Sequence, residues 1–201
     1  MVLTNKLNIT DQIELARVEE KISKQKAKQL FDSGDINNVE VGTFAGLAYI
    51  HAYLFAEIYH FAGKIRDVNI SKGTTIFARV MYLEPSLKHI DAMPQTSSDE
   101  IIEKYVEMNV AHPFREGNGR ATRIWLDLML KKEIQQVVDW NRVDKEEYLA
   151  AMQRSVVKDL EIKALLKQAL TDQIHDRALF MKGIDVSYYY EGYSEFRTEE
   201  L

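Results

Sequence analysis

Apolar residues recur at the spacing of α-helices along most of the chain. In the segment 11–31 they alternate with charged residues, with Ile13 and Leu30 among the apolar positions, and Ser33-Gly34-Asp35 follow as a stop signal. The segment 41–61 is the most apolar of the chain, and we expect it to form the central packed helix. Further helices are predicted over residues 99–111, 119–132, 144–155, 159–171, 175–182 and 185–196, with Gly183 separating the last two.

The pattern changes between residues 69 and 82. Residues 74–82 are rich in β-branched and aromatic side chains, up to Val80 and Tyr82, and Ser71-Lys72-Gly73 before them has turn chemistry. This predicts a β-hairpin over about 69–82, and Pro85 suits the start of the next helix. The chain has only 3 prolines, so helix breakers are rare. We therefore expect an all-α fold, a helical bundle with one small β-hairpin.

Composition and charge narrow the class of protein. A length of 201 residues fits a single domain over residues 1–201. The net charge of −5 leaves no basic footprint for wrapping nucleic acid, and the lack of cysteine excludes disulfides and thiolate metal sites. The first residues hold no apolar core of a signal peptide, and His51, Glu57 and His60 argue against a membrane span in the apolar segment. We expect a cytoplasmic protein.

The segment 112–123 carries the candidate chemistry. It reads HPFREGNGRATR and is followed at once by an apolar helical pattern. A glycine loop that opens a helix presents free backbone amides and the positive end of the helix dipole, and both attract phosphate. The segment supplies a base (His112), a carboxylate (Glu116), two loop glycines (Gly117, Gly119) and two guanidiniums (Arg120, Arg123).

These residue types together predict phosphoryl-type transfer to an incoming hydroxyl. Arg120 and Arg123 lie three residues apart, on one helix face, and can bind two phosphate groups. Glu116 can hold a divalent cation whose shell the phosphates complete, and His112 can take a proton from a hydroxyl. Residue chemistry alone leaves open which phosphate is attacked and which base the nucleotide carries. The other four histidines have no metal-ligand spacing and are expected to be packing or surface residues.

The same segment matches every fixed position of the signature of the Fic family, His-Pro-Phe-x-(Asp/Glu)-Gly-Asn-Gly-Arg-x-x-Arg. A second match, Ser187 to Gly192 (SYYYEG), resembles the inhibitory motif of the short, self-inhibited subclass called class III. A third, looser match covers residues 54–63 and the hairpin after them. The resemblance implies a Fic-type bundle with a flap at about 69–82, a signature loop and helix at 112–132 and a C-terminal inhibitory helix at about 185–196.

The resemblance also implies the activity and the role of each site residue. It implies that a protein hydroxyl (Tyr, Ser or Thr) attacks the α-phosphate of ATP. AMP is thereby transferred to that hydroxyl, and pyrophosphate is released. His112 would be the general base and Glu116 the ligand of Mg²⁺, with Mn²⁺ or Ca²⁺ as alternatives. The nucleotide would be bound by Lys72, Asn109, Gly117, Asn118, Gly119, Arg120, Arg123 and Gln153, with the stretch 148–155 near the adenine. The flap, including Lys72 and Gly73, would align the target segment as an added strand.

The second motif and the resemblance to class III imply how the protein is regulated and which partners it has. Glu191 would inhibit by occupying the place of an outer phosphate oxygen beside Arg123; in some relatives the same glutamate orients water to remove AMP from a target. Alternatives are a non-enzymatic nucleotide sensor and a helical nucleic-acid-binding protein, the latter disfavoured by charge. The resemblance further suggests a bacterial protein with topoisomerase subunits as targets, self-modification at Tyr188 and self-association.

Overall fold

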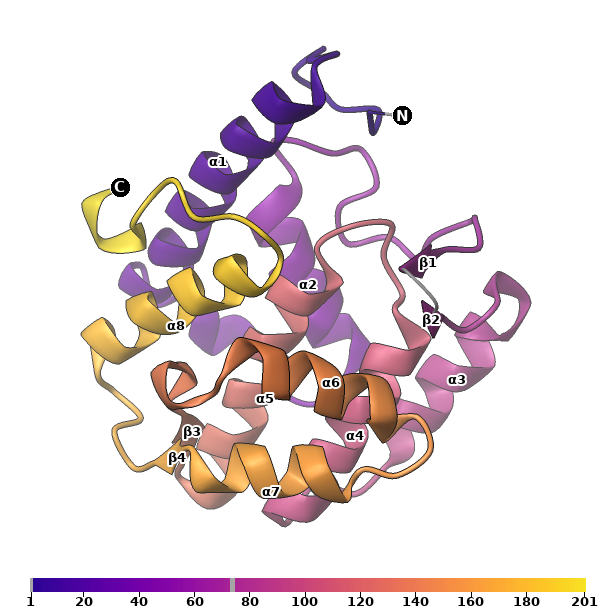
Figure 1. The fold of residues 1–201 in the computed structure, drawn as a ribbon, viewed down its shortest axis with the longest axis vertical. Helices are drawn as coiled ribbons and strands as arrows, with labels where there is room; N and C mark the ends of the chain where they lie inside the picture. Colours follow the sequence, from indigo (N-terminus) through magenta and orange to yellow (C-terminus); the bar gives the residue numbers. More distant parts are fainter. Residues whose placement is uncertain (1, 73–74) are drawn as a thin grey trace.

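The computed structural model describes residues 2–72 and 75–201, and in this part of the chain it contains eight α-helices (Figure 1). The predicted all-α fold with a small antiparallel hairpin is confirmed. The predicted helix 11–31 corresponds to α1, Gln12–Asp32, which begins where the Asp11 side chain accepts a hydrogen bond from the backbone of Glu14. A short 3-10 helix, Asp35–Asn38, follows. Among the described residues, no helix is both long and apolar enough to cross a membrane.

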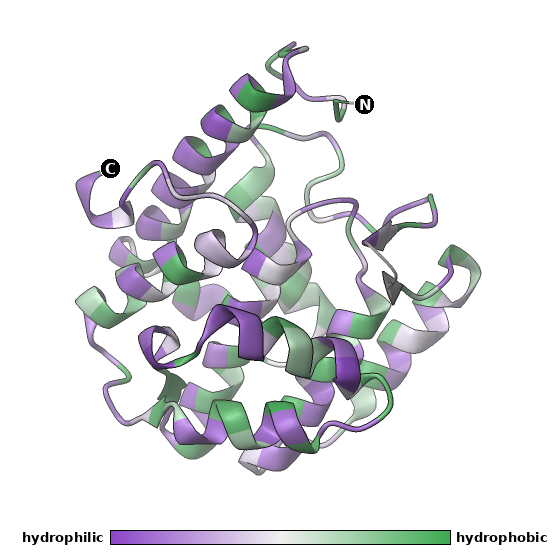
Figure 2. Ribbon diagram, viewed as in Figure 1, coloured by the Kyte–Doolittle hydropathy of each residue, from purple (hydrophilic) through white to green (hydrophobic). Residues whose placement is uncertain are grey.

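Helix α2, Phe44–Phe55, forms the centre of the core, with α1 and α5 packed against it. Figure 2 shows the apolar character of this central helix against the more polar α1. The predicted helix over 41–61 is shorter in the structure because turns replace its last part and lead to Gly63, whose φ is +72°. The side chains that α2 buries completely are Leu47, Ile50, His51 and Leu54.

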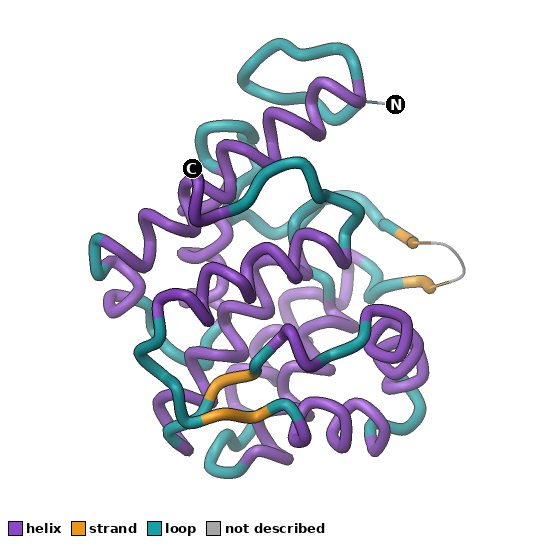
Figure 3. Tube along the Cα trace, turned by 60° about the vertical axis from the view of Figure 1, so that its left-hand side comes forward, coloured by secondary structure: helices purple, strands orange, loops and turns teal. Residues whose placement is uncertain are grey.

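The predicted hairpin is present but shorter than 69–82. Strands β1 (Ser71–Lys72) and β2 (Thr75–Ile76) pair antiparallel (Figure 3), whereas residues 73 and 74 lie outside the described part of the chain. Val80 and Tyr82 were predicted as strand residues, and this is wrong: they begin helix α3, Val80–Ala92, and Pro85 lies inside it rather than at its start. The burial of Leu83, Leu87 and Ile90, at helical spacing, outweighs the strand propensity of the first turn.

Helices α4 (Ser98–Ala111) and α5 (Asn118–Ile134) pack against each other and flank the loop 112–117. A capping box of Ser97 and Glu100 begins α4, as the polar run before it predicts. Trp125 of α5 is fully buried, and its indole nitrogen donates to the Thr43 carbonyl at 3.0 Å. The two helices therefore hold the loop between them on a rigid core.

The last part of the chain differs from the prediction in two places. Helix α6 is Lys145–Ser155 and α7 is Leu160–Gln168. Helix α7 is shorter than the predicted 159–171 because Leu170–Thr171 (β4) pairs with Val137–Val138 (β3). The two helices predicted over 175–182 and 185–196 are one helix, α8, Arg177–Tyr190. Gly183 lies inside α8, where an added Cβ would be 3.2 Å from Trp140 of the 3-10 helix Trp140–Arg142. That glycine allows close packing instead of breaking the helix.

After α8 the chain returns to α1 and ends near the 3-10 helix Thr198–Glu200 (Figure 1). The buried Lys24 of α1 holds this tail: its ammonium lies 3.0 Å from Glu20, 3.0 Å from Asp185 of α8 and 2.5 Å from the Phe196 carbonyl. The C-terminal tail thereby packs against α1.

Candidate active site

A cavity of about 630 Å³ lies between the hairpin, the end of α4, the start of α5, helix α6 and the end of α8. Its size is that of a small-molecule site. The walls bring together most of the residues predicted from the signature and its companion motif, but neither Arg120 nor Tyr188 is among them. The lining residues are Ile70, Ser71, Lys72, Phe77, Asn109, Val110, His112, Arg115, Glu116, Gly117, Asn118, Gly119, Arg123, Tyr148, Leu149, Met152, Gln153, Val156 and Glu191.

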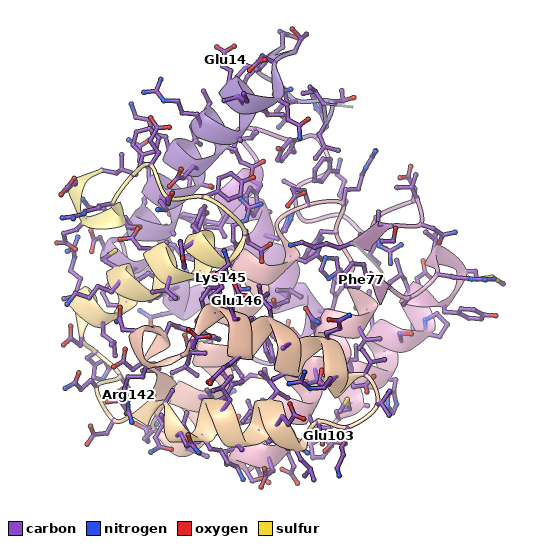
Figure 4. All side chains as sticks on the ribbon, viewed as in Figure 1. Glu14, Phe77, Glu103, Arg142, Lys145 and Glu146 are labelled. Carbon is purple, nitrogen blue, oxygen red and sulfur yellow. The ribbon has the colours of Figure 1, made fainter. Side chains whose placement is uncertain are left out.

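His112 ends helix α4 in a left-handed conformation, with φ +49° and ψ +63°. Pro113 disfavours helical geometry at His112, so the helix stops there and the imidazole faces the cavity. The guanidinium of Arg66 fixes the turn, since its Nε donates to the His112 carbonyl at 2.8 Å. The ring of Phe77 (labelled in Figure 4), which follows β2, stacks on the imidazole with centroids 3.6 Å apart.

The hydrogen bond of the imidazole defines which nitrogen can accept a proton. Nδ1 of His112 lies 3.2 Å from the Asn109 carbonyl oxygen, which can only accept, so Nδ1 carries the hydrogen and Nε2 has the lone pair. Desolvation lowers the pKa of His112 to about 4, although the Asn109 carbonyl and Glu191 act in the opposite direction. The imidazole is therefore neutral at physiological pH and can act as a base.

The loop 113–117 brings backbone amides to the cavity. The Asn118 side chain closes the loop on itself, because its Oδ1 accepts from the Phe114 amide at 2.9 Å and its Nδ2 donates to the Phe114 carbonyl at 2.8 Å. Gly117 has φ +76°, and a Cβ there would lie 2.6 Å from Phe55. The first turn of α5 then presents amides that have no partner within the helix, a site suited to an anion.

Glu116 is the carboxylate that this loop offers to a cation. Its side chain is 41% exposed and lines the cavity, and its Oε1 lies 3.0 Å from Arg120 Nη2. His51 holds the backbone at this point: its Nδ1 accepts from the Gly63 amide, so its Nε2 donates to the Glu116 carbonyl at 2.8 Å. The described residues contain no cluster of three or more metal-type side chains. One carboxylate facing a phosphate site fits Mg²⁺, which commonly binds through a single carboxylate, phosphates and water.

Arg123 is the guanidinium that reaches the cavity. Nη1 donates to the carbonyl oxygen of Ser187 at 3.1 Å and to its Oγ at 2.8 Å, and Nη2 donates to Glu191 at 3.2 Å. The side chain is 4% exposed. Its central carbon also lies 5–6 Å from three aromatic rings, those of Trp140, Tyr148 and Tyr190.

Glu191 follows the last residue of α8 and crosses the cavity from α5 to the hairpin. Its Oε1 accepts from Arg123, and its Oε2 accepts from Lys72 Nζ at 2.8 Å. Burial opposes ionisation, but Arg123 and Lys72 prevail and lower the pKa of Glu191 to about 2. A Cβ on Gly119 would lie 2.4 Å from Oε1, so the carboxylate sits directly over the first turn of α5. A carboxylate thus occupies the position where the helix could bind a phosphate.

The structure does not bring Arg120 to the cavity, contrary to its predicted phosphate contact. Arg120 is 1% exposed; its Nη1 lies 2.5 Å from Glu19 of α1 and its Nη2 binds Glu116. An i,i+3 spacing places Arg120 and Arg123 on neighbouring parts of one helix surface, but α5 is buried nearly all round, so the two side chains meet different partners. Arg120 enters the core between α1, α2 and the tail.

Three further predicted positions have clear places. Tyr188, the candidate for self-modification, is 1% exposed, and its ring packs near Lys24 and Arg120, so it is inaccessible in this conformation. Asn109 and Gln153 both line the cavity. Helix α6, which carries the stretch expected near the adenine, supplies one wall with Tyr148, Leu149, Met152 and Gln153, whereas Gly73 lies outside the described residues.

Sequence reasoning missed the residues that support this site from distant parts of the chain. His51 was expected to be a packing or surface histidine, yet it holds the Glu116 carbonyl, and Phe77 was expected only as a strand residue. Glu19 appeared as one charged position on an amphipathic helix. A buried position on the apolar face of the most apolar helix is a signal that could have identified His51, but no local pattern marks Glu19.

The family model and the relatives that match this chain point to one family. Residues 43–130 match the model of the Fic/DOC family. A probable protein adenylyltransferase (y4lH) of Sinorhizobium fredii is 31% identical over 79% of this chain and 85% of the relative. A probable protein adenylyltransferase Fic of Escherichia coli is 29% identical over 79% of this chain and 82% of the relative.

Solved structures agree with the fold. The BepC protein of Bartonella tribocorum, crystallised with bound AMPPNP, superposes with a TM-score of 0.69 at 20% identity. The match covers 86% of this chain and 94% of that one.

Proposed function

Because the chain belongs to the Fic/DOC family, we propose that it is a protein adenylyltransferase, which moves AMP from ATP to a hydroxyl group of a protein and releases pyrophosphate. One observation carries the proposal: a neutral imidazole, the first turn of α5, the carboxylate of Glu116 and the guanidinium of Arg123 line the same cavity. A site that only bound nucleotide would have no need of a base with its lone pair free.

The chemical step follows from the atoms that face the cavity. His112 Nε2 takes the proton of the target hydroxyl while that oxygen forms a bond to the α-phosphorus of ATP. The bond between the α-phosphorus and its bridging oxygen breaks, and the electron pair leaves with pyrophosphate. The backbone amides at 117–119 stabilise the negative charge that develops on the α-phosphate oxygens. Nδ1–H, bound to Asn109, keeps the imidazole in the required tautomer.

A divalent cation held by Glu116, with Mg²⁺ as the first candidate and Mn²⁺ or Ca²⁺ as alternatives, would neutralise charge on the phosphate oxygens. Arg123 is the guanidinium expected to bind the outer phosphates, but Glu191 and Ser187 already engage it. Transfer therefore requires Glu191 to leave Arg123. We infer that the chain is self-inhibited in the conformation described here.

Replacing the inhibitory carboxylate tests this proposal directly. Glu191→Gly should raise transfer of AMP to the protein itself or to an added target by about ten- to a hundredfold, because a charge-assisted hydrogen bond is worth about 1.5–3 kcal/mol. The measurement is incorporation of label from α-labelled ATP. Glu195→Gly is the matched control, since Glu195 lies in the same tail but pairs with the exposed Arg17. Equal or lower incorporation in Glu191→Gly would argue against inhibition by this residue.

The base assignment needs a second substitution in the active background. His112→Ala combined with Glu191→Gly should abolish incorporation while nucleotide binding persists, because the imidazole contributes a proton acceptor and not the phosphate contacts. Full activity of the double variant would contradict the assignment of His112 as the base. Nucleotide binding without any incorporation in Glu191→Gly itself would instead favour a nucleotide-sensing module.

Removal of AMP from a modified protein is a second candidate function. The low pKa of Glu191 and its place on the cavity wall favour it, because an ionised carboxylate beside His112 can orient an attacking water. Incubating a pre-modified protein with the wild-type chain and following AMP release tests this activity. Release that survives Glu191→Gln would exclude the carboxylate from that role.

The protein substrate is proposed on the family resemblance alone, with topoisomerase subunits as first candidates. The exposed edge of the hairpin could pair with an extended target segment as an added strand. Mass spectrometry of a lysate incubated with ATP, Mg²⁺ and the Glu191→Gly variant would identify the modified proteins.

A further inference from the structure

Arg120 belongs to the signature segment, but its side chain lies in the core and not in the cavity. The guanidinium is buried, and its Cζ lies 4.8 Å from the ring of Phe55 and 4.8 Å from that of Tyr193. A buried cation in apolar surroundings requires a counter-charge. Two carboxylates supply it: Glu19, 2% exposed, at 2.5 Å, and Glu116, 41% exposed on its side chain, at 3.0 Å.

The two carboxylates differ in what else they can bind. Glu19 lies within the core, where the hydroxyl groups of Tyr59 and Tyr193 also donate to it, so its orientation is fixed from α2 and from the tail. Glu116 faces the cavity, and its Oε2 makes no hydrogen bond to a described residue. As long as Glu19 balances Arg120, Glu116 can turn its charge toward another cation.

We propose that Glu19 is a positioning residue for the reaction: by balancing the charge of Arg120, it leaves Glu116 available to a divalent cation. The inference rests on the proposed function, because it takes Glu116 as the metal ligand. Without Glu19, Glu116 would be the one carboxylate among the described residues left in an ion pair with the buried guanidinium. A metal ion would then have to compete with Arg120 for it. Glu19 would then control metal affinity from α1 without touching metal or nucleotide.

The test measures metal binding rather than turnover. Binding of Mn²⁺ in the presence of AMPPNP is followed by the electron paramagnetic resonance signal of free Mn²⁺. Glu19→Gln should weaken Mn²⁺ binding about tenfold, since an opposite charge at this distance shifts a carboxylate's affinity for a cation by a factor of this order. Glu20→Gln is the matched control: Glu20 is the next residue of α1, equally buried and paired with Lys24, and should leave Mn²⁺ binding unchanged.

A double variant separates charge balance from general damage to the core. Glu19→Gln with Arg120→Met removes both the buried anion and the buried cation, so Mn²⁺ binding should return to within about twofold of wild type. If Glu19→Gln fails to fold, the double variant still decides, because weak Mn²⁺ binding in a folded double variant would mean that Arg120 assists the metal and would overturn the inference.

Failure of this inference is distinguishable from failure of the proposed function. Glu116→Ala should abolish tight Mn²⁺ binding; if it does not, both the metal site and the role of Glu19 are overturned. If Glu116→Ala abolishes binding while Glu19→Gln binds Mn²⁺ like wild type, the role of Glu19 alone is overturned. Wild-type affinity in Glu19→Asp, which retains the charge, together with weak binding in Glu19→Gln supports the inference.

Discussion

At the scale of single residues, the site depends on how the His112 imidazole is oriented and on which of its nitrogens carries the hydrogen. His112 ends α4 in a left-handed conformation, and Arg66 donates to its carbonyl. The Asn109 carbonyl accepts a hydrogen bond from Nδ1. Phe77 covers one face of the ring and reduces its contact with water. The same surroundings that orient the base also lower its pKa.

The pH dependence of transfer should reveal this lowered pKa. The proposed base His112 would act in its neutral form. Its pKa of about 4 lies below the ordinary value of 6.5, so this base should stay active as the pH falls through 6.5 and be lost only near 4. The turnover number of Glu191→Gly at saturating ATP and Mg²⁺ should change less than about twofold between pH 8 and 5.5. A rate that halves near pH 6.5 would indicate a solvated imidazole.

The site residues that could be predicted are those whose role depends on local sequence. Pro113 and the glycine loop require His112 and the amides of 117–119 to lie where a helix ends and the next begins. The fate of Arg120 could not be predicted in this way, because its partner Glu19 lies 101 residues earlier in the chain. Helical spacing describes one helix surface, whereas the choice between cavity and core depends on which helix packs there.

At the scale of elements, α8 links the core to the cavity as one uninterrupted helix. Its residue Ser187 binds Arg123 through both its hydroxyl and its carbonyl, and Glu191 follows at its end. The helix dipole places a partial negative charge near this end, which adds to the attraction for Arg123. The proposed inhibition therefore depends on how α8 packs against α5.

Weakening the contact between Ser187 of α8 and Arg123 of α5 should activate the protein partially. Ser187→Ala removes one hydrogen bond to a charged group but retains the carbonyl contact, so AMP incorporation should rise by up to roughly tenfold, less than for Glu191→Gly. Incorporation of label from α-labelled ATP measures this rise. Ser155→Ala is the control, because the Ser155 hydroxyl bonds the Met152 carbonyl and does not line the cavity. A fall in incorporation would mean that Ser187 helps to bind ATP.

Helix boundaries were predictable where caps mark them and not where packing decides. Asp11, Ser97 and Asp144 cap their helices, and those starts agree with the sequence pattern within about one residue. Gly183 was a misleading signal, since glycine serves there for close approach to Trp140. The first turn of α3 has strand-forming residues, but the buried face of the helix prevails.

At the scale of the whole molecule, Lys24 joins α1 to α8 and to the tail that follows α8. Its ammonium is 1% exposed and lies between Glu20 of α1, Asp185 of α8 and the carbonyl of Phe196 in the tail. The tail amides of residues 195 and 196 also donate to Glu20. The tail therefore holds α8 and α1 together.

Removing this cation should destabilise the protein strongly. Lys24→Ala leaves the buried carboxylate of Glu20 and the partly exposed one of Asp185 without their cation. Loss of one partner of a buried ion pair typically costs about 3–5 kcal/mol in the free energy of unfolding. Urea unfolding followed by circular dichroism measures the change. Lys26→Ala, on the outer face of α1, removes a partly exposed pair with Glu57 and should cost less than about 1 kcal/mol. Similar losses for the two variants would contradict the role of Lys24.

The two contacts of Glu191 face very different surroundings, and dissolved salt should separate them. The Lys72 side chain is 69% exposed, so counter-ions from solution can screen its attraction to Glu191, whereas Arg123 is 4% exposed and largely shielded from them. Raising the ionic strength should therefore free the hairpin from Glu191 before it frees α5. The protein would then pass through a state in which the entrance for a target is open while the outer phosphates are still excluded.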